Sequence, residues 1–138
     1  MIIPYITFSG NCRKALDFYS LAFGATTSML QPYGDYVPEG IGEPPADLKD
    51  WVLHAEMEIC GAKFWFADEC VEPVLAGSMV KLTATVPTRA DAQEIFDRLK
   101  QNATITLPPT QTFYCTFHAA LIDQYGMCWN IVSEEAPE

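Results

Sequence analysis

The sequence predicts an α+β fold made of two βαβββ modules whose curved mixed sheets form a cup. The element order strand, helix, strand, strand, strand can be read twice along the 138 residues. Two pairs of residues also repeat at one spacing, because 64 residues separate His54 from His118 and Trp65 from Trp129. A repeated order of elements with a constant spacing predicts two modules of similar structure.

The first module opens with an apolar stretch at residues 2–8 that is rich in β-branched residues and predicts a strand. After a turn at 9–11, residues 12–23 carry apolar side chains at helical spacing, and Gly24 stands where a helix ends. Residues 25–30 suit a short strand. The module therefore begins as strand, helix, strand.

A long loop is predicted at residues 31–50, which hold four Pro, three Gly and five acidic residues and suggest a lid. Residues 51–59 then alternate between apolar and polar side chains, as a half-buried strand does. Gly61 turns the chain into a further strand at 63–67, so that the two strands form a hairpin.

The second module repeats this order. A strand is predicted at 79–86, and the spacing of Thr88 and Asp91 resembles a capping box at the start of a helix. The inner face of that helix carries apolar residues at helical spacing, namely Ala92, Ile95, Phe96 and Leu99. The remaining predicted elements are a strand at 104–107 ended by Pro108 and Pro109, strands at 113–122 and 127–132 joined by a turn at 123–126, and a polar tail at 133–138.

We expect residues 1–138 to form a single domain that contains two modules, 1–70 and 78–134. The loop at 31–50 accommodates the greater length of the first module. Each module would carry its helix on the convex side of its sheet, and the two concave sides would enclose the cup. An apolar hollow with a few convergent polar groups is where a small molecule would bind.

Composition and charge narrow the function classes. Hydrophobic residues make up 49% of the chain and charged residues 19%, which indicates a globular protein. The net charge of −10 disfavours nucleic acid and anionic membranes as partners. No apolar run approaches the ~20 residues of a membrane helix, and the first residues do not resemble a signal peptide. We therefore expect a cytoplasmic protein that contacts neither nucleic acid nor membrane.

The five cysteines are odd in number, scattered and without a C-x-x-C pair. This pattern favours reduced thiols over a disulfide framework or a structural zinc site. Most of them are expected to be small buried apolar side chains.

Several segments resemble one known family. They are the stretch from Pro4 to Tyr19, the triplet at 23–25, and the segments 54–57, 64–68, 111–114 and 123–129. Together they resemble the PhnB-like subgroup of the glyoxalase/bleomycin-resistance/dioxygenase superfamily, also called vicinal oxygen chelate proteins. The resemblance implies the glyoxalase/bleomycin-resistance/dihydroxybiphenyl dioxygenase-like fold and a homodimer. It implies no particular activity, because the superfamily includes lyases, epimerases, dioxygenases and proteins that sequester drugs.

Enzymes of that superfamily chelate a divalent metal through His and Glu on the first and last strands of each module. The resemblance places those positions at Pro4, Trp65, Lys81 and Asn130, and a shift of two residues at Lys81 would present Met79 or Thr83. None of these residue types is a strong ligand for a divalent metal. We therefore expect no metal and no cofactor at the usual positions.

His54 and Glu56 offer a different metal site, because they share one face of their predicted strand with further polar residues. The alternative interpretation is an ordinary solvated polar face on a half-buried strand. A site built on His54 and Glu56 would support a metal-dependent lyase, isomerase or dioxygenase with relocated ligands.

The candidate ligand-binding residues are those expected to line the cup. By strand parity and by the match of Trp65 to a family ligand position, they are Ile6, Phe8, Trp65, Tyr114, His118 and Asn130. His118 could equally be a structural histidine. A nucleophilic pair of Cys115 with His118 would need a bulge, because residues 115 and 118 point to opposite faces of a regular strand. Catalytic residues therefore stay unassigned.

The chain has no glycine-rich phosphate loop, no serine-hydrolase elbow and no glycine-rich turn of the kind that binds a methyl donor. The sequence thus predicts a protein that binds a flat or cationic small molecule in an aromatic, metal-free cup. The alternatives are the metal-dependent enzyme and a structural dimer with a collapsed cup.

Overall fold

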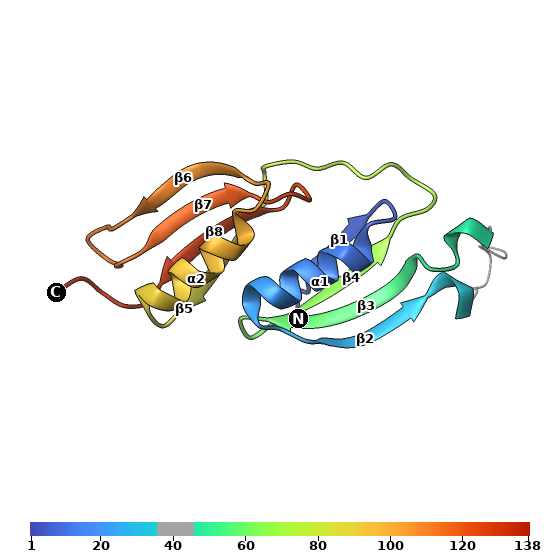
Figure 1. Cartoon of the computed structure of the whole chain (residues 1–138), viewed down its shortest axis with the longest axis horizontal. Coiled ribbons are helices and arrows are strands. Elements are labelled where there is room, and N and C mark those ends of the chain that lie inside the picture. The colour runs from blue at the N-terminus through green and yellow to red at the C-terminus, as the bar shows by residue number, and fades with distance from the viewer. Residues whose placement is uncertain (36–45) are drawn as a thin grey trace. The chain divides into compact units, whose positions relative to one another are not determined.

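The computed structural model describes residues 1–35 and 46–138. The chain divides into two compact units, Met1–Leu75 and Ala76–Glu138 (Figure 1). Both units combine one helix with a four-stranded mixed sheet. The predicted α+β class is therefore confirmed, and each unit is described by itself.

The first unit has the predicted order of elements. They are β1 (Tyr5–Phe8), α1 (Cys12–Phe23), β2 (Thr27–Pro32), β3 (Val52–Ile59) and β4 (Ala62–Asp68), with short 3-10 turns at Tyr33–Asp35 and Ala46–Leu48. The sheet order is β1-β4-β3-β2. β1 runs parallel to β4, and the other neighbours are antiparallel. The residues of the suggested lid at 36–45 lie outside the described residues.

The second unit repeats this arrangement with β5 (Leu82–Val86), α2 (Arg89–Leu99), β6 (Thr104–Thr110), β7 (His118–Ile122) and β8 (Cys128–Ser133). Its sheet order is β5-β8-β7-β6, with β5 parallel to β8. In each βαβββ unit the first strand thus lies at an edge of the sheet and pairs in parallel with the last strand. Among the described residues, neither helix is long or apolar enough to cross a lipid bilayer.

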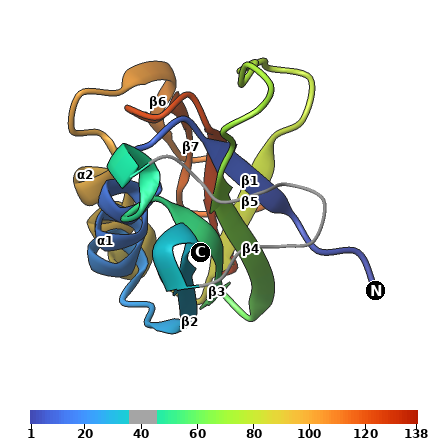
Figure 2. The ribbon, with the colours of Figure 1, turned by 90° about the vertical axis from the view of Figure 1, so that its right-hand side faces the viewer.

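Helix α1 covers one face of the first sheet (Figure 2). Tyr19 of α1 stacks on Phe66 of β4 with ring centroids 6.1 Å apart, and Phe8 of β1 also stacks on Phe66 with ring centroids 6.4 Å apart. Because side chains alternate along a strand, Phe64 shares this face and Trp65 lies on the other. We call the face away from α1 the open face of the first sheet.

The core of the second unit lies between α2 and its sheet. Phe96 of α2 contacts Phe117 with ring centroids 6.0 Å apart, and Leu121, Trp129 and Ile131 are each no more than 2% exposed. The indole N–H of Trp129 donates to Asp123 Oδ2 at 2.9 Å. The face that carries Trp129 and Ile131 is therefore the covered one.

Several predicted strand boundaries were wrong, among them three in the second unit. β6 continues through Pro108 and Pro109, β7 begins at His118 instead of residue 113, and β5 begins at Leu82 instead of residue 79. Proline lacks the N–H of a sheet ladder, but β6 is an edge strand whose register shifts between Leu107 and Thr110. Phe113 is 94% exposed in the loop before β7.

The register of the repeat also differs from the prediction. The last parallel pairs are Phe8 with Asp68 and Val86 with Ser133, so Trp65 corresponds to Asn130 and not to Trp129. A slip of one residue moves a side chain to the other face of a sheet. Trp65 therefore lies on an open face, whereas Trp129 lies against a helix.

Candidate functional site

Three aromatic rings meet on the open face of the first sheet. The rings of Tyr5 and Trp65 lie 5.8 Å apart at 84°, those of Tyr5 and His54 lie 5.9 Å apart at 85°, and those of His54 and Trp65 lie 4.9 Å apart at 82°. Near-perpendicular contacts of this kind are favourable for aromatic rings. With Glu56, we call these residues the Trp65 cluster.

Strand register brings the Trp65 cluster together. Tyr5 is the parallel partner of Trp65 across β1 and β4, and Glu56 is its antiparallel partner across β3 and β4. His54 lies two residues from Glu56 on β3 and so shares its face. The cluster therefore follows from the pairing of three strands that are distant in sequence.

The polar groups of the Trp65 cluster are arranged around the rings. His54 Nε2 lies 3.3 Å from Glu56 Oε2, and these side chains are 24% and 39% exposed. Tyr5 is 52% exposed, and its pKa is raised by partial burial and, to a smaller extent, by the nearby Glu69 and Cys12. Tyr5 is thus a neutral phenol at neutral pH. The cluster offers ring faces, one imidazole and one carboxylate.

Two of the residues predicted to line the cup lie elsewhere in the first unit. Ile6 pairs with Phe66, and Phe8 is 5% exposed and stacks on that same ring. Both therefore belong to the face covered by α1, and the prediction that they point the same way as Trp65 was wrong. The prediction assigned alternate residues of β1 to the wrong faces of the sheet, because Tyr5 and not Ile6 is the partner of Trp65. The register of the parallel pairing between β1 and β4 would have been needed to assign them correctly.

The other predicted residues lie in the second unit. His118 and Asn130 share the face of their sheet that α2 does not cover, where Asn130 Nδ2 donates to Thr83 Oγ1 at 3.4 Å. Tyr114 Oη lies 3.1 Å from His118 Nδ1. The structure therefore brings Tyr114 and His118 together.

Cys115 does not take part in this arrangement. Its thiol is buried and lies 3.1 Å from Thr112 Oγ1. The ring nitrogen of His118 is bound to Tyr114 instead. A nucleophilic pair of Cys115 with His118 finds no support in these contacts.

The residues present do not fit the usual metal of the superfamily. The corrected register places Tyr5 with Trp65 and Thr83 with Asn130 at the paired positions, in place of the Pro4 and Lys81 expected from the sequence. A phenol, an indole, a hydroxyl and an amide are poor substitutes for imidazole and carboxylate.

The relocated site on His54 and Glu56 also lacks ligands. In residues 1–35 and 46–138, no group of three His, Cys, Asp or Glu side chains is placed to hold a metal ion. Two ligands from one strand fall short of the three protein ligands that catalytic zinc sites use. We therefore do not favour the metal-dependent alternative.

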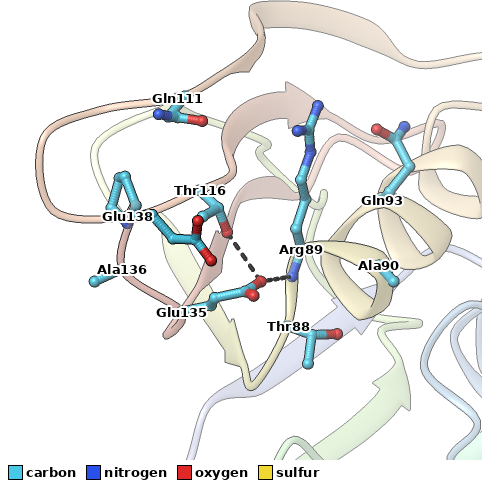
Figure 3. A pocket seen from close by; sticks show the side chains of 10 residues that line it. Thr88, Arg89, Ala90, Gln93, Gln111, Thr116, Glu135, Ala136 and Glu138 are labelled. Atoms are coloured by element: carbon cyan, nitrogen blue, oxygen red, sulfur yellow. Dashed lines mark hydrogen bonds between the residues drawn. The ribbon is translucent and has the colours of Figure 1, made fainter.

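A pocket of about 850 Å³ lies in the second unit at the start of α2 (Figure 3). Glu135 enters it and accepts hydrogen bonds from the backbone N–H of Arg89 at 2.9 Å and from Thr116 Oγ1 at 3.3 Å. The tail of the chain thus already pairs the first backbone N–H of α2. None of the residues predicted to bind a ligand lines this pocket.

No family model matches the chain. The curated protein YjdN of Escherichia coli K12 is 23% identical over 96% of this chain and 95% of its own length. Protein PA1353 from Pseudomonas aeruginosa has a crystal structure that matches with a TM-score of 0.83 and 27% identity over 97% of each chain. The likeness therefore runs from end to end in both comparisons.

Two further solved structures connect this fold with named groups. The PhnB protein from Bacillus cereus, described as a putative 3-demethylubiquinone-9 3-methyltransferase, matches with a TM-score of 0.77 and 22% identity over 96% of this chain and 98% of its own. A glyoxylase/bleomycin resistance protein/dioxygenase domain from Frankia sp. EAN1pec matches with a TM-score of 0.64 and 13% identity over 100% and 92%. The chain thus has the fold of the glyoxalase/bleomycin-resistance/dioxygenase (vicinal oxygen chelate) superfamily, and it shares this fold with the PhnB protein from Bacillus cereus.

Proposed function

We propose that the Trp65 cluster binds a small organic cation or flat cationic ring without a metal. The observation that supports this most directly is the grouping of three aromatic rings with the Glu56 carboxylate on one open sheet face. Cations bind to the faces of Trp, Tyr and similar rings, and Trp binds them best. A carboxylate beside the rings adds charge complementarity.

The charge of the whole chain supports the same ligand class. The net charge of −10 raises the local concentration of cations and repels anions. Small-molecule sites typically combine a mostly apolar surface with a few placed polar groups, as the Trp65 cluster does. The specific activity, if the bound molecule is also transformed, is unassigned.

Direct binding measurements test this proposal. We expect 9-aminoacridine and ethidium to quench tryptophan fluorescence saturably, and an anionic dye of similar size to fail. Glu56→Gln should weaken cation binding about fivefold or more, because it removes the charge beside the rings. Glu58→Gln is the matched control, since Glu58 is exposed and lies two residues further along β3. Equal binding by Glu56→Gln and the native chain would contradict the proposal.

We also propose, on the family resemblance, that the chain forms a homodimer in the cytoplasm and that its two units belong to a single domain. Light scattering on the purified chain would test the dimer, and a mass of one chain would contradict it.

The Tyr114 and His118 pair is proposed as a second ligand contact. Its hydrogen bond holds the imidazole in a defined orientation.

A further inference from the structure

The indole nitrogen of Trp65 is a buried hydrogen-bond donor without an acceptor. Among the buried side-chain nitrogen and oxygen atoms of the described residues, it alone has no hydrogen-bond partner. Trp129 shows the usual situation, because its indole N–H donates to Asp123. Buried polar groups in folded proteins are nearly always paired, so an exception calls for a specific explanation.

The neighbours of Trp65 are well placed to contact a ligand but leave this donor unpaired. Tyr5 and His54 meet Trp65 edge to face, and Glu56 Oε2 lies near His54 Nε2 instead. The unpaired donor thus lies within the same group of side chains that we propose as a cation site.

We infer that the ligand of the Trp65 cluster is a zwitterion, a cationic group joined to a hydrogen-bond acceptor such as a carboxylate. The acceptor pairs with the Trp65 indole N–H, and the cationic group contacts the ring faces beside Glu56. This inference rests on the proposed function and narrows its ligand class. It explains both the unpaired donor and the acidic side chain with one molecule.

The acceptor reaches the buried N–H when a neighbouring ring moves. Tyr5 is the ring best placed to move, because it is 52% exposed and begins the four-residue strand β1 at the edge of the sheet. Short edge strands are the less stable parts of a sheet. Ligand binding would therefore displace Tyr5 and leave β3 and β4 in place.

Three small probes separate the two halves of the proposed ligand. Glycine betaine carries a quaternary ammonium and a carboxylate, tetramethylammonium carries only the cation, and acetate carries only the acceptor. We expect betaine to bind about tenfold more tightly than tetramethylammonium, which is the effect of one hydrogen bond to a charged acceptor. Acetate should bind most weakly.

Proton–nitrogen NMR spectra of the native chain give the direct measurement. The indole N–H of Trp65, assigned by its loss in Trp65→Phe, should move downfield with betaine and hardly move with tetramethylammonium. The indole N–H of Trp129, already paired with Asp123, is the internal control and should not move. Trp65→Phe keeps a ring and removes the donor, so it should lower betaine affinity to that of tetramethylammonium.

The outcomes distinguish this inference from the function on which it rests. Cation binding in which betaine and tetramethylammonium have equal affinities, or in which the Trp65 N–H does not move, overturns the zwitterion and keeps the cation site. Failure of both cations and of the aromatic dyes overturns both proposals. If Trp65→Phe does not fold, the spectra of the native chain with the three probes still decide.

Discussion

The buried carboxylate of Asp68 shows how one residue can hold the first unit together. Asp68 is 2% exposed, and its oxygens accept hydrogen bonds from the backbone N–H groups of Gly10 at 2.8 Å, Cys12 at 3.1 Å and Val52 at 2.8 Å. These donors belong to the turn before α1, the first turn of α1 and the start of β3. Asn11, which stands at the N-cap position of α1, makes no side-chain cap. Asp68 therefore does the capping from β4.

Replacement of Asp68 by alanine should destabilise the fold strongly. Asp68→Ala leaves three backbone donors without their acceptor, and the expected loss in the free energy of unfolding is about 3–5 kcal/mol. Urea unfolding of the native and variant chains measures it. Asp17→Ala is the control, because Asp17 is exposed on α1 and its loss should change stability by less than about 0.5 kcal/mol. Equal midpoints for Asp68→Ala and Asp17→Ala would refute the capping role.

The same residue scale shows why the candidate site could be predicted only in part. Trp65 and Asn130 were placed at corresponding positions, and the structure agrees with that correspondence. Tyr5 was missed and Ile6 and Phe8 were included, because alternation along one strand does not say which parity faces the helix. That choice depends on the contact between Phe66 and Tyr19, which joins β4 to α1 and is long-range in sequence.

At the scale of elements, local signals predicted the helices better than the strands. Helix α2 begins after Thr88, whose side chain accepts from the N–H of Asp91, and its four buried residues are the predicted ones. Helix α1 ends at Gly24 with φ of 65°. By contrast, the start of β7 and the course of β6 depend on pairing with neighbouring strands. Such pairing overrides local preference, as the prolines in β6 show.

The hairpin between β3 and β4 offers a test of turn chemistry. Cys60 and Gly61 form its two-residue turn with φ of 49° and 82°, so both central residues are left-handed. Asn tolerates that conformation better than other residues with a Cβ, and Asn-Gly is the preferred pair in such turns. Cys60→Asn should therefore raise the free energy of unfolding by about 0.5 kcal/mol.

The measurement is the urea midpoint at constant slope. Cys70→Asn is the comparison variant, because Cys70 is also an exposed cysteine but does not have a positive φ, and it additionally loses the contact of the Cys70 thiol with Tyr33 Oη at 3.6 Å. We expect no gain from it. A lower midpoint for Cys60→Asn than for the native chain would mean that the thiol contributes more than the turn geometry costs.

At the scale of the whole molecule, length and composition predicted more than any motif did. The globular class and the repeated order of elements follow from the spacing of apolar residues in the 138-residue chain. The predicted repeat was one residue out of register on the last strand of each unit. His54 and His118 occupy corresponding positions, whereas Trp65 corresponds to Asn130 and not to Trp129. The proposed binding site draws its side chains from three strands, and no short sequence motif records such a grouping.

Alkaline pH should destabilise the folded chain through two effects that act in the same direction. Burial raises the pKa of Cys12 above its ordinary value of 9.0 and that of Tyr33 above 10.0, with smaller effects from Asp68 on Cys12 and from Cys70 on Tyr33. Above about pH 9 the unfolded chain loses these protons while the folded chain keeps them. The contribution of the two groups to the free energy of unfolding is therefore fully present below about pH 9 and falls as pH rises further. Each proton lost also adds to a net charge that is already −10.

Salt separates the two effects. In low salt, the urea midpoint should be lower at pH 10 than at pH 7. Addition of 0.5 M NaCl should restore only the share of this loss that comes from repulsion between surface charges, because salt screens those charges within about 4–5 Å. Burial of the thiol and phenol is insensitive to salt, so a loss should remain and should be smaller in Cys12→Ala. Full recovery in salt would assign the alkaline loss to net charge alone and would contradict the role given to Cys12 and Tyr33.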